Sequence, residues 1–212
     1  MTAIELRNVS RWYGNVVAVN DITMTIGPGV TGLLGPNGAG KSTLLHLISG
    51  FLAPSRGELT VGGAASWHNP DIYRTIGLVP ERDSVYAFLT GEEFVRTAAR
   101  LHKLPDADAA ARRAIAIVEM ADAQDRKIST YSKGMRQRIK VAAALVHDPA
   151  IMCIMVDFPA PFGPSRPVTP GPIVIVMSLT ATTLPYHRET LRSSIAVMTQ
   201  RPSGTGRQGR PG

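Results

Sequence analysis

The sequence predicts an α/β fold with a helical subdomain. Short apolar runs of strand length come first, and one of them, residues 30–34, leads directly into the glycine-rich run at residues 35–43. From Thr90 onward the apolar residues recur at helical spacing instead. A last apolar run, residues 151–156, is again of strand length. Strands, then a helical block, then one more strand are typical of an α/β domain with a helical insertion.

The predicted strands are short apolar or alternating runs bounded by turn residues. Gly27-Pro28-Gly29 predicts a turn before the third strand, and Asn20-Asp21 predicts a break within the second. The strands expected from these patterns cover residues 3–9, 16–26, 30–34, 57–61, 75–79 and 151–156.

The predicted helices follow apolar residues spaced three and four apart. The first begins near Lys41 and is expected to end close to Gly50, which suits a C-cap. Three more are expected over residues 92–101, 106–120 and 134–146. Together these three define a helical subdomain over about residues 82–140.

The C-terminal part of the chain reads as the antisense translation of its own N-terminal part. Reverse-complementing the first two bases of a codon turns Gly into Pro, Thr into Val, Ser into Asp or Glu, and Lys into Phe or Leu. When residue j is paired with residue 199 − j, the rule holds at all 43 pairs from Met1/Met198 to Thr43/Val156. We therefore expect a partial domain over residues 1–150, a junction over 151–155 and a non-native tail over 156–212. The inversion is either a rearrangement of the gene or an artefact of assembly.

The sequence of the antisense tail also allows structural predictions. Residues 159–172 are rich in proline, which lacks an amide donor and cannot join a central strand. Residues 173–177 keep strand character, because Thr exchanges with Val and Ile with Met under reverse complement. We expect residues 151–156 to form a strand beside the glycine-rich run at residues 35–43, with 173–177 added as a neighbouring strand. Residues beyond about 185 are expected to be irregular.

The charge of the chain does not indicate a nucleic-acid partner. The formal net charge is +7, but residues 1–150 carry only +3 of it and the antisense tail carries +4. One cysteine, Cys153, excludes an internal disulfide framework and a multi-cysteine metal site. No apolar run approaches the ~18 residues of a membrane span. We expect a soluble cytoplasmic protein.

The glycine-rich run is a complete phosphate-binding motif, G-x-x-x-x-G-K-S. Its glycines allow backbone N–H groups to point at phosphate oxygens, and the following helix adds its positive N-terminal end. Lys41 supplies a charge for the terminal phosphates and Ser42 a hydroxyl for Mg²⁺. The motif by itself predicts binding of a nucleoside triphosphate with Mg²⁺, without indicating which base. The residues expected to bind the nucleotide, which the family resemblance below specifies as ATP, are Gly35, Asn37, Gly38, Gly40, Lys41, Ser42 and Thr43.

A second motif narrows the family. Tyr131-Ser132-Lys133-Gly134-Met135 is followed by a helical stretch and by Asp148-Pro149. This segment resembles the L-S-G-G-Q signature of ABC-type ATPases, with Ser132 and Gly134 matching and Tyr131, Lys133 and Met135 as substitutions. With the phosphate loop, it makes residues 1–150 resemble a P-loop NTPase of the ABC ATPase type. Variants of this kind are similar to ATPase subunits of bacterial exporters.

The resemblance implies roles for further residues. Tyr13 stands where the family places an aromatic that stacks on adenine. Glu81 stands at the position of the Gln that joins the Mg²⁺ site to the helical subdomain, with an added negative charge. Residues 83–90 correspond to the region that faces a membrane-spanning transporter subunit. The four histidines of residues 1–150 form no ligand-spaced set and are read as surface or helix-end residues: His46, His68, His102 and His147.

The chain departs from the family pattern after Asp148-Pro149. Family members continue with an apolar strand ending in Asp-Glu-Pro, then an Asp loop and a switch His. Here the run ends in Asp157-Phe158-Pro159, in which Asp157 is the antisense of Ser42 and Phe158 of Lys41. Phe158 has no atom that orients water, and losing a general base typically costs about 10²–10⁴-fold in rate. No intact catalytic residue is expected, and hydrolysis is not expected.

Three functions stay open at this point. The first is an ATP-binding subunit of an ABC transporter, working as a homodimer in the intact parent and located at the inner face of the membrane through its partner. The second is a soluble ABC ATPase acting on DNA or ribosomes, which usually has two ATPase halves or long insertions. The third is a non-functional gene fragment. The transported substrate is selected by the membrane subunit.

Overall fold

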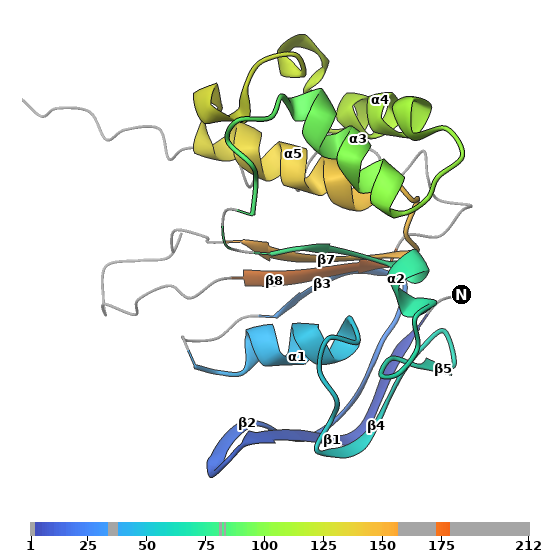
Figure 1. The fold of residues 1–212 in the computed structure, drawn as a ribbon. Coiled ribbons are helices and arrows are strands. Elements are labelled where there is room, and N and C mark those ends of the chain that lie inside the picture. The colour runs from blue at the N-terminus through green and yellow to red at the C-terminus, as the bar shows by residue number, and fades with distance from the viewer. Residues whose placement is uncertain (1–2, 34–37, 81, 83, 157–172, 179–212) are drawn as a thin grey trace, which may run out of the picture.

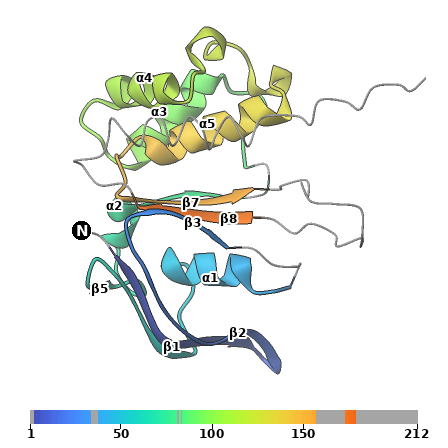
Figure 2. The same ribbon diagram turned by 180° about the vertical axis from the view of Figure 1, so that it is seen from behind.

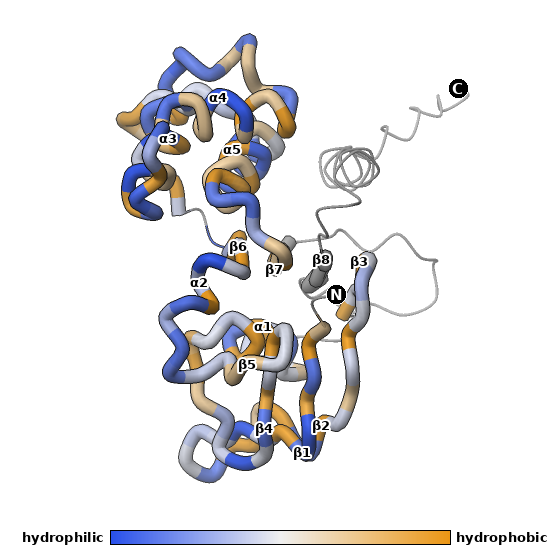
Figure 3. The backbone as a smooth tube through the Cα atoms, turned by 90° about the vertical axis from the view of Figure 1, so that its right-hand side faces the viewer, coloured by the Kyte–Doolittle hydropathy of each residue, from blue (hydrophilic) through white to orange (hydrophobic). Residues whose placement is uncertain are grey.

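The computed structural model describes residues 3–33, 38–80, 82, 84–156 and 173–178. These residues stack in layers: an antiparallel sheet, helix α1, a second sheet and a block of helices (Figure 1). In the view of Figure 3 the helical block and the antiparallel sheet lie at opposite ends, with the second sheet between them. The predicted α/β fold with a helical subdomain is confirmed.

The first sheet is antiparallel, in the order β2-β1-β4-β5. Its strands are β1 (Ile4–Tyr13), β2 (Val16–Ile26), β4 (Arg56–Val61) and β5 (Ala64–Ala65). The break expected at Asn20-Asp21 is an irregularity inside one continuous strand. Asp21 has a φ of 48°, and the register between β1 and β2 shifts on either side of the Val9–Ile22 pair.

The second sheet has the order β3-β8-β7-β6. Its strands are β3 (Gly29–Leu33), β6 (Ile76–Val79), β7 (Ile151–Val156) and β8 (Ile173–Ser178). β6 and β7 pair in parallel, whereas β8 is antiparallel to both β3 and β7. The strands expected over 151–156 and 173–177 are therefore confirmed. β8, however, separates β7 from β3, so β7 does not pair with the strand that leads into the phosphate loop.

Strand β7 is buried on both faces, which explains its continuous apolar sequence. Ile151, Cys153 and Met155 belong to the core shared with α1 and the first sheet, whereas Met152 and Ile154 belong to the core under the helical block. The second sheet thus contributes side chains to both hydrophobic cores. Burial raises the pKa of the Cys153 thiol to about 12, so this cysteine stays protonated and inert.

Helix α1 (Lys41–Ile48) lies between the two sheets (Figure 1). Leu44, Leu45, Leu47 and Ile48 are buried in the core beneath it. The helix ends as predicted, because Ser49 is the C-cap and Gly50 follows with a φ of 72°, the left-handed conformation that terminates helices.

The helical block contains α3 (Gly91–Leu101), α4 (Ala107–Ile117) and α5 (Lys133–Leu145). Short elements complete it or connect it to the sheets: α2 (Ile72–Thr75) and the 3₁₀ turns Ala121–Ala123 and Ile128–Thr130. Thr90 and Glu93 form a capping box at the start of α3. Asp106 caps α4, and that helix ends earlier than predicted because Glu119 has a φ of 57°.

Two sequence predictions lie outside the described residues: the proline-rich stretch 159–172 and the irregular region beyond 185. Among the helices that the structure describes, none combines the length and apolar character that a membrane span needs.

Candidate nucleotide site and its surroundings

The phosphate loop lies between β3 and α1. Gly38 and Gly40 both have a φ of 84°, the left-handed conformation that glycine adopts without strain. Gly40 is the N-cap of α1, and a Cβ there would run into the carbonyl oxygen of Ala18 on β2. The position therefore admits only glycine, both for its φ and for its contact with β2. Gly35 and Asn37 lie outside the described residues.

The first turn of α1 presents the charge and hydroxyls that the motif predicts. Lys41 begins the helix and is buried, with 8% of its surface exposed, while Ser42 and Thr43 are half-buried. No acidic residue occupies this first turn. The positive end of the helix dipole is therefore available to an anion, together with the N–H groups of the turn. This donor set fits phosphate oxygens, and Ser42 is the described side chain that fits a metal ion bound to them.

Tyr13 lies at the end of β1, in the hairpin with β2. Its side chain is 45% exposed, and the Arg11 guanidinium sits over the ring at 4.9 Å from its centroid. The same β2 strand contacts the phosphate loop through Ala18 and Gly40. Arg11 occupies one face of this ring, so a flat aromatic ligand would stack on the other face, and the use of Tyr13 for adenine stays a prediction.

The signature segment forms the start of α5. The Ser132 hydroxyl accepts a hydrogen bond from the Met135 backbone N–H at 3.2 Å and so caps the helix. Ser132 and Lys133 are exposed, while Tyr131 is buried and donates its hydroxyl to the Ala123 carbonyl at 2.6 Å. Burial raises the pKa of the Tyr131 phenol above its ordinary value. The Tyr131 anchor thus holds an exposed, basic helix start in place.

The two predicted ligand segments lie on opposite faces of the second sheet. Helix α1 covers one face and α5 the other, and both helices begin at the same side of the sheet (Figures 1 and 2). Within this chain, the structure therefore does not bring Lys41 and Ser42 together with Ser132 and Gly134.

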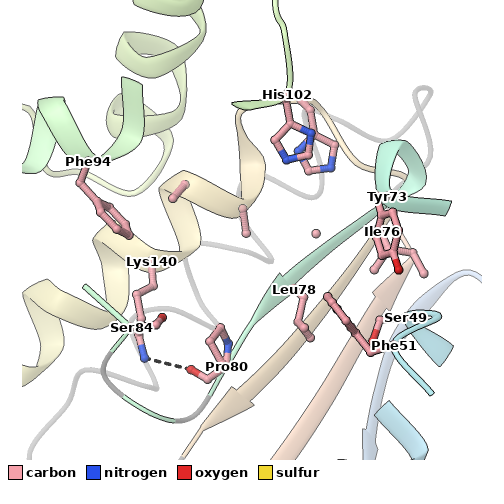
Figure 4. Close-up of a pocket in the computed structure, with 14 residues that line it drawn as sticks. Ser49, Phe51, Tyr73, Ile76, Leu78, Pro80, Ser84, Phe94, His102 and Lys140 are labelled. Carbon is pink, nitrogen blue, oxygen red and sulfur yellow. Dashed lines mark hydrogen bonds between the residues drawn. The ribbon is translucent and has the colours of Figure 1, made fainter. Parts of the chain in front are cut away.

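A cavity of about 290 Å³ lies between the second sheet and the helical block (Figure 4). Phe51 and Tyr73 form its wall near α1 and α2, with their ring centroids 5.6 Å apart. Phe94 of α3 lines the opposite side, and the exposed ring of Tyr86 lies 6.4 Å from it. Phe88, which is 71% exposed, lies next to Tyr86 with ring centroids 5.9 Å apart, so these two exposed rings adjoin the Phe94 side of the cavity without lining it.

The cavity also contains features that the sequence did not reveal. Lys140 of α5 is only 4% exposed and reaches the loop after β6. His102 and His147, interpreted from the sequence as surface or helix-end residues, are stacked against each other. Neither contact carries a sequence signal, since the partners are far apart along the chain.

Some predicted residues receive no structural test. Glu81 and the segment Asp157-Phe158 lie outside the described residues, so their roles stay predictions. In the described part of the chain, no group of three or more His, Cys, Asp or Glu side chains is arranged to hold a metal ion.

Comparison with known proteins identifies the family. A family model described as ABC transporter matches residues 19–155. The chain is 34% identical over 154 residues to the linearmycin resistance ATP-binding protein LnrL of Bacillus subtilis, covering 70% of this chain and 49% of the relative. It is 38% identical over 158 residues to the Nod factor export ATP-binding protein I of Cupriavidus pinatubonensis, covering 72% and 48%. The chain thus spans about half the length of these curated relatives.

Solved structures agree on the fold. The dimeric MJ0796 ABC transporter cassette matches with a TM-score of 0.60 at 23% identity, covering 71% of this chain and 72% of that one. The cbiO1 protein of Clostridium perfringens, described as part of the cbiONQ transporter complex, matches with a TM-score of 0.65 at 20% identity, covering 92% and 74%. With the phosphate loop at the start of α1 and the signature segment at the start of α5, the chain belongs to the ABC transporter family.

Proposed function

We propose that this chain derives from the ATP-binding subunit of an ABC transporter and that it binds Mg²⁺-ATP at the loop between β3 and α1. The observation that carries the proposal is the start of α1. Left-handed glycines at 38 and 40, a helix N-terminus without acidic residues, and Lys41 and Ser42 in its first turn form one anion-binding unit. In this proposal Tyr13 stacks on the adenine, and Ser42 holds the Mg²⁺, with Glu81 as a second metal-side group.

The intact parent is proposed to act as a homodimer. The phosphate loop and the start of α5 lie on opposite faces of the sheet, so one chain cannot close both segments on a single nucleotide (Figure 1). Pairing the phosphate loop of one copy with Ser132 and Gly134 of another solves this problem. Lys133 is exposed at this helix start and would add a positive charge beside the terminal phosphate.

The membrane-spanning subunit is proposed to dock at the cavity between the sheet and the helical block. Phe51 and Tyr73 line this cavity, and Tyr86 and Phe88 adjoin its Phe94 side. All four side chains have 42% to 71% of their surface exposed. Such a cluster is suited to an apolar side of a partner segment. In this proposal the protein lies at the cytoplasmic face of the membrane and binds no nucleic acid, and the partner selects the transported substrate.

This chain is proposed to bind ATP without hydrolysing it. The support is the sequence after β7, where Asp157-Phe158 stands in place of Asp-Glu. We further propose the division into a partial domain over 1–150, a junction over 151–155 and an antisense-derived tail over 156–212, which makes the chain a fragment of its parent.

A nucleotide titration tests the binding proposal. Purified full-length chain is titrated with a fluorescent ATP analogue in the presence of Mg²⁺. Lys41→Ala is expected to abolish binding, because the remaining N–H groups lack the charge for the terminal phosphates. Lys127→Ala removes an exposed lysine of the helical block and serves as the control. Equal affinities for native chain and Lys41→Ala would refute the proposed site.

A further inference from the structure

Lys140 is an unusual side chain for its place in the fold. It lies in the middle of α5 among the buried residues Ile139, Val141 and Ala142, and only 4% of its surface is exposed. Burying an ammonium group is costly unless hydrogen bonds replace its hydration. An apolar residue would fill such a position at lower cost, so the charge points to a specific contact.

That contact is with the backbone of the loop after β6. The Lys140 Nζ donates to the carbonyl oxygen of Pro80 at 3.0 Å and to that of Arg82 at 3.2 Å. Figure 4 shows the side chain reaching from α5 across the edge of the cavity to Pro80. One ammonium group thus donates hydrogen bonds to the backbone carbonyls on both sides of position 81.

The packing between α5 and β6 sets the reach of this side chain. A Cβ at Gly77 of β6 would lie only 2.5 Å from the carbonyl oxygen of Ala144 on α5. Helix and strand are therefore in backbone contact one turn beyond Lys140. A rigid helix–strand contact and a charged tether at the strand end together fix the loop relative to α5.

The tether, meaning the two hydrogen bonds from Lys140 to the loop after β6, starts from the helix that carries the signature segment. It follows Lys133, the first residue of the helix, by two helical turns, so it lies on the same helix as the signature segment. The loop it holds follows β6, at the edge of the sheet, and also borders the cavity through Pro80 and Ser84. Lys140 therefore connects three regions: the start of α5, the loop after β6 and the cavity.

We propose that Lys140 is a positioning residue that holds the backbone of Pro80 and Arg82 to the signature helix, so that the helix and these two residues respond to nucleotide together. The proposal rests on the proposed nucleotide site, because position 81 is the predicted metal-side residue. Loss of the tether releases the loop while leaving the phosphate loop itself unchanged.

Hydrogen–deuterium exchange of the full-length chain tests the tether directly. Lys140→Met keeps an unbranched side chain, one atom shorter, and removes the donors, so amides at residues 81–85 are expected to exchange about tenfold faster. Lys140→Arg keeps a cation with several N–H donors at this position and is expected to stay within about twofold of the native chain. Lys127→Met, a matched change at an exposed lysine, is expected to have no effect on this loop.

The effect of Mg²⁺ on ATP affinity distinguishes a positioning role of Lys140 from a purely structural one, because a purely structural residue would leave that effect unchanged. The ratio of ATP affinities with Mg²⁺ and with EDTA is expected to fall about tenfold in Lys140→Met, while the affinity in EDTA stays unchanged. Lys140→Arg is expected to restore the ratio. If the native chain fails to bind ATP, the proposed function fails, and the exchange experiment still decides on Lys140.

A clear outcome overturns the proposal. Exchange of residues 81–85 within about twofold of native in folded Lys140→Met means that the tether does not hold the loop. Should Lys140→Met fail to fold, Lys140→Gln replaces it, because its shorter amide cannot span to both carbonyls. Native-like exchange in Lys140→Gln would then refute the proposal equally.

Discussion

The imidazole rings of His102 and His147 stack face to face, with centroids 3.9 Å apart and planes inclined by 11°. His102 ends α3 and His147 follows α5, so the pair joins two helices at the wall of the cavity. Burial lowers the pKa of both rings, and the repulsion that two protonated rings would experience lowers the pKa of His147 further, to about 4. Both ring nitrogens of His147 are buried without a hydrogen-bond partner among the described residues. The stack is therefore a contact between neutral rings.

This stack predicts a loss of stability in mild acid. The pKa of His147 is near 6.5 in an unfolded chain and about 4 in the folded one. Between these values the unfolded state binds more protons, so the free energy of unfolding falls as pH drops from about 6.5 to about 4. Because the ring is only partly buried, we expect a loss of about 1 kcal/mol.

His147→Phe isolates this contribution, because it keeps an aromatic ring and removes the titrating group. Urea unfolding from pH 7 to pH 4.5 is expected to show a shallower pH dependence in His147→Phe than in the native chain. His68→Phe, at an exposed histidine outside the pair, is the control. Parallel curves for native chain and His147→Phe would contradict the prediction.

Gly77→Ala is expected to destabilise the chain by about 2–3 kcal/mol. The added Cβ would lie 2.5 Å from both the Ala144 carbonyl oxygen and the Met152 sulfur, and the carbonyl belongs to a helix that cannot move alone. Gly27→Ala is the matched control, since nothing lies within 4 Å of its Cβ. Thermal or urea midpoints measure both. Similar midpoints for the two variants would show that α5 does not pack on β6 this closely.

Val176→Pro tests whether β8 is part of the sheet. Val176 is paired with Thr31 of β3 on one side and with Cys153 of β7 on the other. Proline removes the amide donor and fixes φ, so a central strand loses about 2 kcal/mol or more. Val176→Thr keeps the β-branched shape and is expected to change the urea midpoint little. A native midpoint in Val176→Pro would mean that β8 adds no stability.

The elements that the sequence predicted share a strong local pattern. β7 is a continuous apolar run because it is buried on both faces, and α3 begins where Thr90 and Glu93 form a capping box. The short elements α2 and β5 were missed, because four and two residues are too few to show a period. β8 was anticipated because reverse complement preserves β-branched residues.

The candidate site was likewise predictable only where its residues form a local sequence motif. The phosphate loop was predictable because glycine, lysine and serine stand at fixed spacing, and the structure adds the reason for Gly40, its contact with Ala18. The tether from Lys140 to Pro80 was not predictable, since those residues are 60 positions apart and meet only through the packing of α5 on β6. The stack of His102 on His147 depends on the same packing of helices.

Steady-state phosphate release measures the central claim most directly, namely that this chain binds Mg²⁺-ATP without turning it over. The assay compares full-length native chain with Lys41→Ala at saturating Mg²⁺-ATP. The account predicts no release above background in either protein, because Phe158 stands where the water-orienting Glu is expected. Release by the native chain that disappears in Lys41→Ala would contradict it.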